Sequence, residues 1–266
     1  MDSLTYVYCL VRSARRPVLR GDTGGMPGGG GVRAIEVDTS LWLIVSTVPA
    51  SEYGEAAIER GLQNMDWVGR LALAHEAVIE RFLSARAVLP MQLFTMFKSD
   101  ERAVENVTGN RARIVKILAR VERQVEWGVR LTWDEQAARE AVERKHASPP
   151  ARGHTSASGT SYLARKRDLL DVNRTQLTAA RAEAGRLYRA MSRKATDAVR
   201  RTATEKAAPG SRLLLDAAFL VPAGGAAVFR AALKDRGRAL ARQGLAVSLT
   251  GPWPPYNFIG PRGKRA

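Results

Sequence analysis

The sequence holds few side chains that could perform acid–base or metal chemistry together. Its three histidines, His75, His146 and His154, are scattered along the chain, and its one cysteine is Cys9. A zinc site needs several His or Cys ligands at short spacings, which are missing here. The motifs of serine hydrolases, zinc proteases and P-loop nucleotide-binding proteins are missing too. We therefore expect no catalytic site, no metal and no cofactor.

His75 is the one candidate for a general base. It lies in a stretch with helical periodicity, and the neighbouring Glu76 cannot face the same way on a helix. A distant carboxylate could in principle assist it, but the sequence offers no second catalytic group. A capped or half-buried structural histidine is the better interpretation.

Residues 20–31 form a glycine-rich segment, with seven glycines between Gly21 and Gly31. Phosphate-binding loops are glycine-rich, but the GxxxxGK[ST] pattern is absent. The strand, helix and downstream acid that accompany a dinucleotide site are also missing. The composition predicts a flexible or disordered surface loop.

The formal net charge is +16, which permits binding to nucleic acid, an acidic protein or an anionic surface. The cations are mainly arginine, which also fits a GC-rich genome. Residues 139–206 carry 16 Lys and Arg against 7 Asp and Glu, so this stretch holds a surplus of nine charges. Such a helical stretch is either a solvated cationic face or a partner surface. The candidate contact residues on it are Arg181, Arg189 and Arg193.

The element pattern predicts an α+β fold organised around residues 66–97. A helix with one apolar stripe over residues 67–83 leads into an apolar strand over residues 87–97, with Pro90 at its start or at an edge or bulge. Further strands are expected at residues 4–11, 32–37, 41–48 and 126–132, and further helices at 51–62 and 100–126. Cys9 is expected to be a buried apolar residue in the first strand.

Two domains follow from this order. Residues 1–126 are predicted to form a ferredoxin-like α+β domain, an antiparallel sheet with helices on one face. Residues 127–266 are predicted to form an α+β C-terminal domain with a long coiled-coil-like helical arm at 133–207. A strand at 213–221, a helix at 226–243 with Val228 facing inward, and a strand at 245–249 follow the arm.

The C-terminal segment TGPWPPYNFIG, residues 250–260, is rigid and extended because it contains three prolines. Its aromatic residues suit either a lid over the core or a contact with a partner. The candidate contact residues are Trp253, Pro254, Pro255, Tyr256 and Phe258.

No run of about 18 apolar residues occurs, so we expect no membrane-spanning helix. The N-terminal segment has the wrong order of charges for a secretory signal, and a single cysteine cannot form an internal disulfide. Both observations favour the cytoplasm.

Several stretches together resemble one known family. They are YVYCLV at residues 6–11, VPASEYGEAAIE at 48–59, MDWVGRLALAHEAVIE at 65–80, AVLPMQLFTMF at 87–97, VEWGVRL at 125–131 and the tail TGPWPPYNFIG. In this order they are similar to the gas vesicle protein GvpL/GvpF family over essentially the whole chain. The long glycine-rich loop and the arginine-rich arm depart from that family's pattern.

The resemblance implies a non-enzymatic accessory or assembly protein of gas vesicles. Its implied partners are the small hydrophobic shell protein GvpA and other accessory Gvp proteins. The alternative from another functional class is a nucleic-acid-binding module that uses the arginine-rich arm at residues 165–201.

Overall fold

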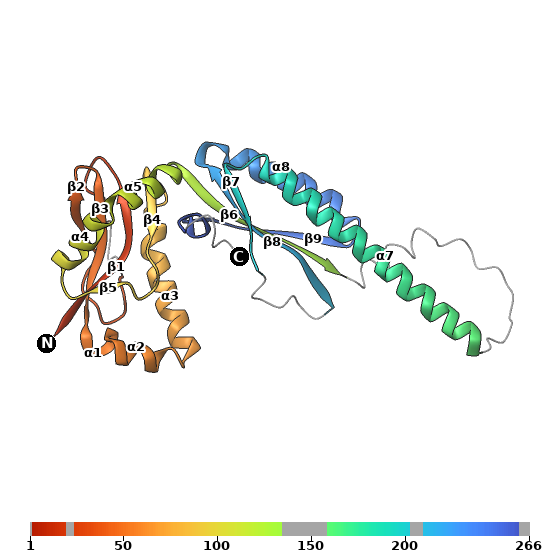
Figure 1. Cartoon of the computed structure of the whole chain (residues 1–266), viewed down its shortest axis with the longest axis horizontal. Coiled ribbons are helices and arrows are strands. Elements are labelled where there is room, and N and C mark those ends of the chain that lie inside the picture. Colours follow the sequence, from red (N-terminus) through yellow and green to blue (C-terminus); the bar gives the residue numbers. More distant parts are fainter. Residues whose placement is uncertain (1, 20–23, 135–158, 203–209, 261–266) are drawn as a thin grey trace. The chain divides into compact units, whose positions relative to one another are not determined.

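The computed structural model describes residues 2–19, 24–134, 159–202 and 210–260, with side chains in the long helix described from residue 174 onward (Figure 1). The chain forms two compact units. One comprises Met1–Glu126 and Pro252–Pro261, and the other comprises Trp127–Gly251. The C-terminal segment therefore packs with the first unit, although it was expected in the second domain. Hydrogen bonds to the carboxyl groups of Glu76 and Glu126 hold it there.

The first unit is built on an antiparallel sheet with β1 at its centre. Its strands are β1 (Ser3–Arg12), β2 (Arg33–Asp38), β3 (Leu41–Pro49), β4 (Ala87–Pro90) and β5 (Met96–Phe97). The strand order is β2-β3-β1-β4, and β5 also pairs with β1. Every residue of β1 from Tyr6 to Val11 is fully buried, including Cys9 as expected. Tyr8 is the extra residue of a β-bulge between Val7 and Cys9.

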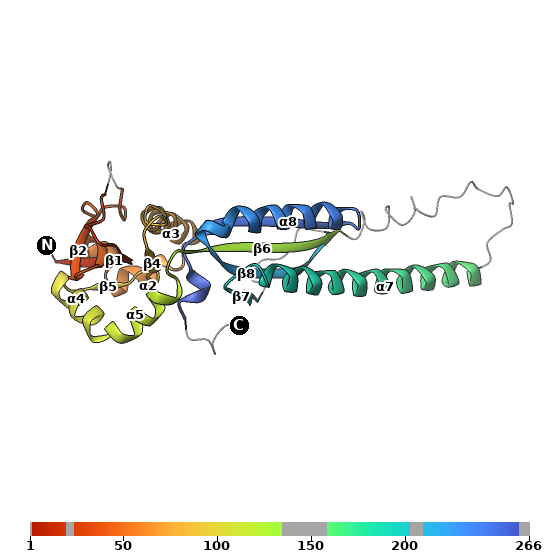
Figure 2. The ribbon, with the colours of Figure 1, turned by 90° about the horizontal axis from the view of Figure 1, so that it is seen from above.

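Helices cover both faces of this sheet, so the expectation of helices on one face was wrong. They are α1 (Ala50–Tyr53), α2 (Glu55–Gly61), α3 (Met65–Glu80), α4 (Asp100–Gly109) and α5 (Arg111–Arg120). In Figure 2, α3 lies on one side of the strands and α4 and α5 lie on the other. A strand that is apolar on both faces needs cover on both, and β1 is such a strand.

Helix starts agree with the sequence better than helix ends do. The Asn64 side chain accepts hydrogen bonds from Asp66 N and Trp67 N, and Ser99 Oγ accepts one from Arg102 N, so Asn64 caps α3 and Ser99 caps α4. In α1, Pro49 holds the N-cap position and no side chain caps the helix.

Three expected elements are interrupted. The helix expected at 51–62 breaks at Gly54, and the helix expected at 100–126 breaks at Asn110 and ends at Arg120. The strand expected at 87–97 ends at Pro90, because proline cannot continue a hydrogen-bonded ladder. A turn follows in which Phe94 has φ 65°, and only then does β5 begin.

The second unit is a four-stranded sheet with two helices on one face (Figures 1 and 2). Its strands are β6 (Gln124–Asp134), β7 (Asp197–Arg200), β8 (Ser211–Pro222) and β9 (Leu245–Trp253), in the order β7-β8-β6-β9. The helices are α7 (Gly159–Ser192) and α8 (Ala226–Ala241). Phe219 of β8 joins the layers, since its ring lies 5.7 Å from that of Tyr188 in α7 and 5.5 Å from that of Phe229 in α8.

The arm expected at 133–207 is shorter than predicted. Trp133 and Asp134 end strand β6, and Asp197–Arg200 pairs with β8 as strand β7. The C-terminal part of α7 packs on the sheet, where Ala184 and Met191 are buried and Tyr188 contacts Phe219 of β8. The predictions for residues 135–158 and 203–209 lie outside the described residues.

In α8 the inward face is Phe229, Leu233 and Leu240, whereas Val228 is 63% exposed and was wrongly expected inside. The stripe on this helix is narrower than its apolar composition indicates. The fold as a whole is α+β with antiparallel strands, as expected. The ferredoxin-like assignment of the first unit stays a prediction, because the described residues between β1 and β2 contain no helix.

Asp216 is a buried acid of β8, and two arginines donate hydrogen bonds to it. Arg201 Nε and Nη2 donate to Oδ1 at 2.8 and 2.5 Å, and Arg130 Nε donates to Oδ2 at 3.3 Å. We expect Asp216→Ala to lower the free energy of unfolding of the second unit by about 2 kcal/mol, because each of two guanidinium groups loses its hydrogen bonding to a buried carboxylate.

Urea denaturation followed by circular dichroism measures this loss. Asp235→Ala is the control, since Asp235 pairs with Arg238 at 3.5 Å on the surface and its loss should cost less than about 0.5 kcal/mol. Equal losses in the two variants would contradict the assignment.

Candidate interaction surfaces

His75 lies in a buried polar network in the first unit and not in a reactive site. The residue is 4% exposed, and both ring nitrogens are hydrogen-bonded. Nε2 lies 3.2 Å from Met91 O and must donate to it, so Nδ1 accepts from Tyr6 OH at 2.8 Å. Neither nitrogen is free to accept a proton from a substrate, which agrees with the structural interpretation of this histidine.

The network ties α3 and the turn before β5 to the central strand. Tyr6 OH also accepts from Phe94 N at 3.3 Å, which holds the positive-φ residue of the turn. The Phe94 ring stacks on Trp67 of α3 with ring centres 5.7 Å apart. Burial lowers the pKa of His75 and raises the pKa of Tyr6, so both groups are neutral at pH 7.

The glycine-rich loop is partly anchored on the same sheet. Tyr8 OH accepts from Met26 N at 2.8 Å, Tyr53 OH donates to Pro27 O at 2.7 Å, and the Met26 side chain is 2% exposed. Gly28 has φ 70°, a conformation that glycine adopts without strain. Tyrosine hydroxyls therefore hold Met26 and Pro27 of the predicted flexible loop against the sheet, and residues 20–23 of that prediction lie outside the described residues.

The C-terminal segment is fastened to the first unit by two acids. Tyr256 OH donates to Glu76 Oε2 of α3. Glu126 Oε1 accepts from Asn257 Nδ2 at 2.5 Å, and Glu126 Oε2 accepts from Asn257 N at 2.9 Å. Burial raises the pKa of Glu76, and the hydrogen bond from Tyr256 acts against that rise. Hydrogen bonds to carboxylates are stronger than neutral ones, so these contacts hold the segment in place.

The candidate contact residues of the C-terminal segment differ in their exposure to solvent. Pro254, Pro255 and Phe258 are buried, whereas Trp253 and Tyr256 are half-buried. Tyr256 also packs against the hydrophobic core of the first unit. This arrangement is what a lid over the core requires, and it leaves only Trp253 and Tyr256 with surface to offer a partner.

The candidate cations Arg181, Arg189 and Arg193 are all exposed. The first two lie on α7, and Arg193 lies one residue beyond its end. The nearby Glu183 pairs with Arg186 at 2.7 Å, and this hydrogen bond lowers the pKa of Glu183. Exposed cations of this kind can contact an acidic partner but form no pocket.

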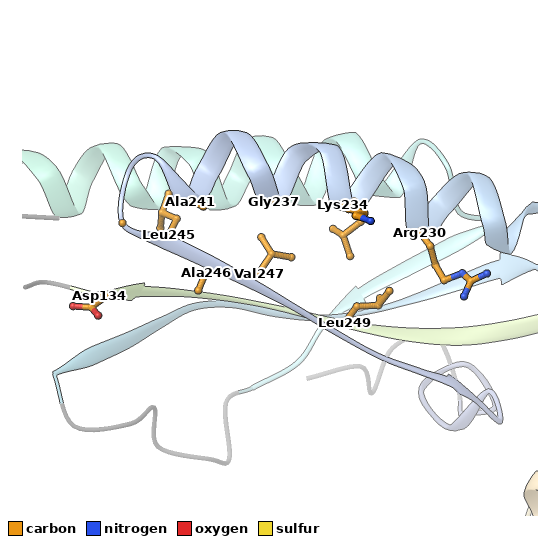
Figure 3. Close-up of a pocket in the computed structure, with 11 residues that line it drawn as sticks. Asp134, Arg230, Lys234, Gly237, Ala241, Leu245, Ala246, Val247 and Leu249 are labelled. Atoms are coloured by element: carbon orange, nitrogen blue, oxygen red, sulfur yellow. The ribbon is translucent and has the colours of Figure 1, made fainter. Parts of the chain in front are cut away.

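A groove of about 580 Å³ in the second unit was not foreseen from the sequence (Figure 3). It lies between α8 and β9, and its lining combines aliphatic residues with Arg230, Lys234 and Asp134. Arg230, Lys234, Gly237 and Ala241 recur at helical spacing, and this periodicity was the available signal. It was missed because Gly237 and two cations interrupt the apolar pattern of the helix.

A second hollow, of about 400 Å³, lies in the first unit between α2 and β5. Its apolar lining is only partly exposed and is flanked by Glu55, Glu59 and Lys98.

Within the described parts of the chain, no three His, Cys, Asp or Glu residues gather closely enough to hold a metal ion. The described helices likewise include none that is long and apolar enough to cross a membrane.

The lowered pKa of His75 predicts a pH-dependent stability. The unfolded chain takes up a proton below about pH 6.5, before the folded protein does, so the free energy of unfolding should fall as the pH drops through that value. The slope from one group is at most about 1.4 kcal/mol per pH unit. Urea titrations from pH 7.5 to 5 measure it.

In His75→Gln this component of the slope should disappear. Tyr6→Phe is the matched control, because it removes one hydrogen bond of the network and leaves the histidine able to titrate. An unchanged slope in His75→Gln would show that other groups cause the pH dependence.

The contacts of Asn257 predict that the C-terminal segment stabilises the first unit. Asn257→Ala removes one charge-assisted hydrogen bond to Glu126 and should lower the free energy of unfolding by about 2 kcal/mol. Cleavage near residue 257 by a nonspecific protease should become faster. Asn110→Ala is the control, because it removes only a hydrogen bond to an exposed backbone carbonyl. It should change the free energy of unfolding by no more than about 0.5 kcal/mol and leave the cleavage rate unchanged. If Asn257→Ala changed neither quantity, the role given to this contact would be refuted.

Comparison with known proteins places the chain in one family. The model of the gas vesicle synthesis protein GvpL/GvpF family matches residues 4–260. Gas vesicle protein L of Streptomyces sp. (strain CB03234) is 31% identical over 262 residues, which cover 97% of this chain and 94% of that protein.

Solved structures agree in fold. The crystal structure of GvpF from Anabaena sp. PCC7120 has a TM-score of 0.67 at 15% identity and covers 97% of each chain. GvpF from Microcystis aeruginosa has a TM-score of 0.63 at 14% identity, over 98% of this chain and all of that one. The family match over nearly the whole length shows that this chain belongs to the GvpL/GvpF family of gas vesicle synthesis proteins.

Proposed function

We propose that this gas vesicle protein is a cytoplasmic assembly factor that binds the hydrophobic shell protein GvpA and other accessory Gvp proteins, and that it catalyses no reaction. The observation that carries the proposal is the family match over residues 4–260. The buried and fully hydrogen-bonded state of His75 supports the absence of catalysis, since it removes the one candidate base.

The physical role follows from the chemistry of a shell subunit. A small protein with a large apolar face aggregates in water, because exposed apolar patches seek burial. A soluble protein that covers such a face before assembly prevents this aggregation. The proposed contact residues are the half-buried Trp253 and Tyr256 and the exposed cations Arg181, Arg189 and Arg193.

Co-purification tests the proposal. Tagged full-length protein should retain GvpA and accessory Gvp proteins when the gas vesicle genes are expressed together, and a deletion strain should form few or no vesicles. Loss of association together with normal vesicles in the deletion strain would refute it. Binding to DNA that weakens steeply with salt would instead favour the nucleic-acid alternative.

A further inference from the structure

The groove between α8 and β9 borders an open edge of the sheet. The described sheet has the order β7-β8-β6-β9, so no described strand lies beyond β9. β9 runs back along β6, since Asp134 N donates to Gly244 O at 3.0 Å and Thr132 Oγ1 to Ala246 O at 3.4 Å. The outer peptide groups of such a strand can pair with an additional extended chain.

Helix α8 supplies a wall that overhangs this edge. Arg230, Lys234, Gly237 and Ala241 are separated by four, three and four positions and therefore share one face. This face lies beside the buried face formed by Phe229, Leu233 and Leu240. A strand added next to β9 would turn alternate side chains toward the wall.

Gly237 keeps the middle of the groove open. A Cβ at this position would lie 3.6 Å from Val247 Cβ and 3.9 Å from its Cγ2, which are ordinary contact distances. Neither packing nor backbone conformation therefore requires glycine here. The missing side chain leaves room beside Val247, and Figure 3 shows the gap between Gly237 and Val247.

The floor and the ends of the groove differ in chemistry. Leu245, Val247 and Leu249 alternate along β9 toward α8, and Val247 and Leu249 are only partly buried. Figure 3 shows Arg230 near the Leu249 end and Asp134 near the Ala246 end. The Arg230 guanidinium lies 5.7 Å from the centre of the Trp127 ring, which fixes its position. α8 carries four cations and only one acid, Asp235.

We propose that this groove binds an extended segment of a partner protein as an additional strand beside β9. Aliphatic side chains of the segment contact Val247 and the open space at Gly237, and acidic side chains pair with Lys234 and Arg230. The open edge selects an extended polypeptide, the floor selects aliphatic residues, and the cations select acids at one end. The inference rests on the proposed function only in requiring a protein partner.

A synthetic peptide tests the groove without knowledge of the partner. The probe is a fluorescent peptide with the nine-residue length of β9, with two glutamates and then three valines at alternate positions and threonine between them. Fluorescence polarisation should show binding to the full chain. Replacing the glutamates by lysine, or a central threonine by proline, should weaken it at least about tenfold, since these changes remove the charge match and a backbone donor.

Variants of the protein locate the binding. Lys234→Glu and Gly237→Leu should each weaken binding about tenfold or more, the first by charge reversal and the second by filling the groove. Arg212→Glu is the control and should change it less than about twofold. Gly237→Ala should weaken binding less than Gly237→Leu, because its methyl group fills only the space next to Val247. Arg212 is exposed on β8 and matches the charge change of Lys234→Glu. Circular dichroism confirms that each variant is folded.

Failure of the inference is separable from failure of the proposed function. No binding of the probe, or equal binding by wild type, Lys234→Glu and Gly237→Leu, would overturn the groove assignment even if GvpA co-purifies. A dimer that Gly237→Leu dissociates would mean that a second copy of this chain is the occupant, and would also overturn it. Probe binding that depends on Lys234, with no Gvp protein retained, would uphold the groove and reject the proposed partners.

Discussion

The central strand β1 imposes the constraint on which the first unit depends. Because Tyr6 to Val11 are buried on both faces, every polar group near them needs a partner inside the protein. Side-chain hydrogen bonds join Tyr6 to His75 and Tyr8 to Ser46, and His75 also bonds to a backbone carbonyl. The same hydroxyls hold the turn at Phe94 and the loop at Met26, so segments without regular structure are fixed by the core and not by their own propensity.

In the second unit, a buried polar group is stabilised by ion pairs. Asp216 lies among apolar residues in the buried part of β8, and its carboxylate is stabilised there by ion pairs with Arg201 and Arg130. Arg201 reaches this position only because the chain forms strand β7 after α7. The buried acid and the unexpected strand are therefore linked, since β7 brings the required guanidinium to the sheet.

The sequence predicted the parts of this fold that depend on local pattern. Examples are the apolar stripe of α3, the burial of Cys9 in β1 and the position of strand β6. What it did not show depended on tertiary contacts. The two-sided burial of β1, the anchoring of the glycine loop by Tyr8 and the turn at Phe94 each involve residues distant in the chain. The groove between α8 and β9 was not predicted, because the absence of a side chain at Gly237 produces no apolar pattern in the sequence.

The fastening of the C-terminal segment has a consequence for the order in which the molecule is completed during translation. Glu126 accepts its hydrogen bonds from Asn257, and Glu76 accepts one from Tyr256, so the first unit lacks these contacts until residues 256 and 257 have been synthesised. At bacterial or eukaryotic elongation rates of roughly 5–20 residues per second, the interval between Glu126 and Asn257 lasts on the order of 10 s. During that time the nascent first unit exposes the surface that the segment later covers, and the ribosome-bound chain is at its most accessible to chaperones.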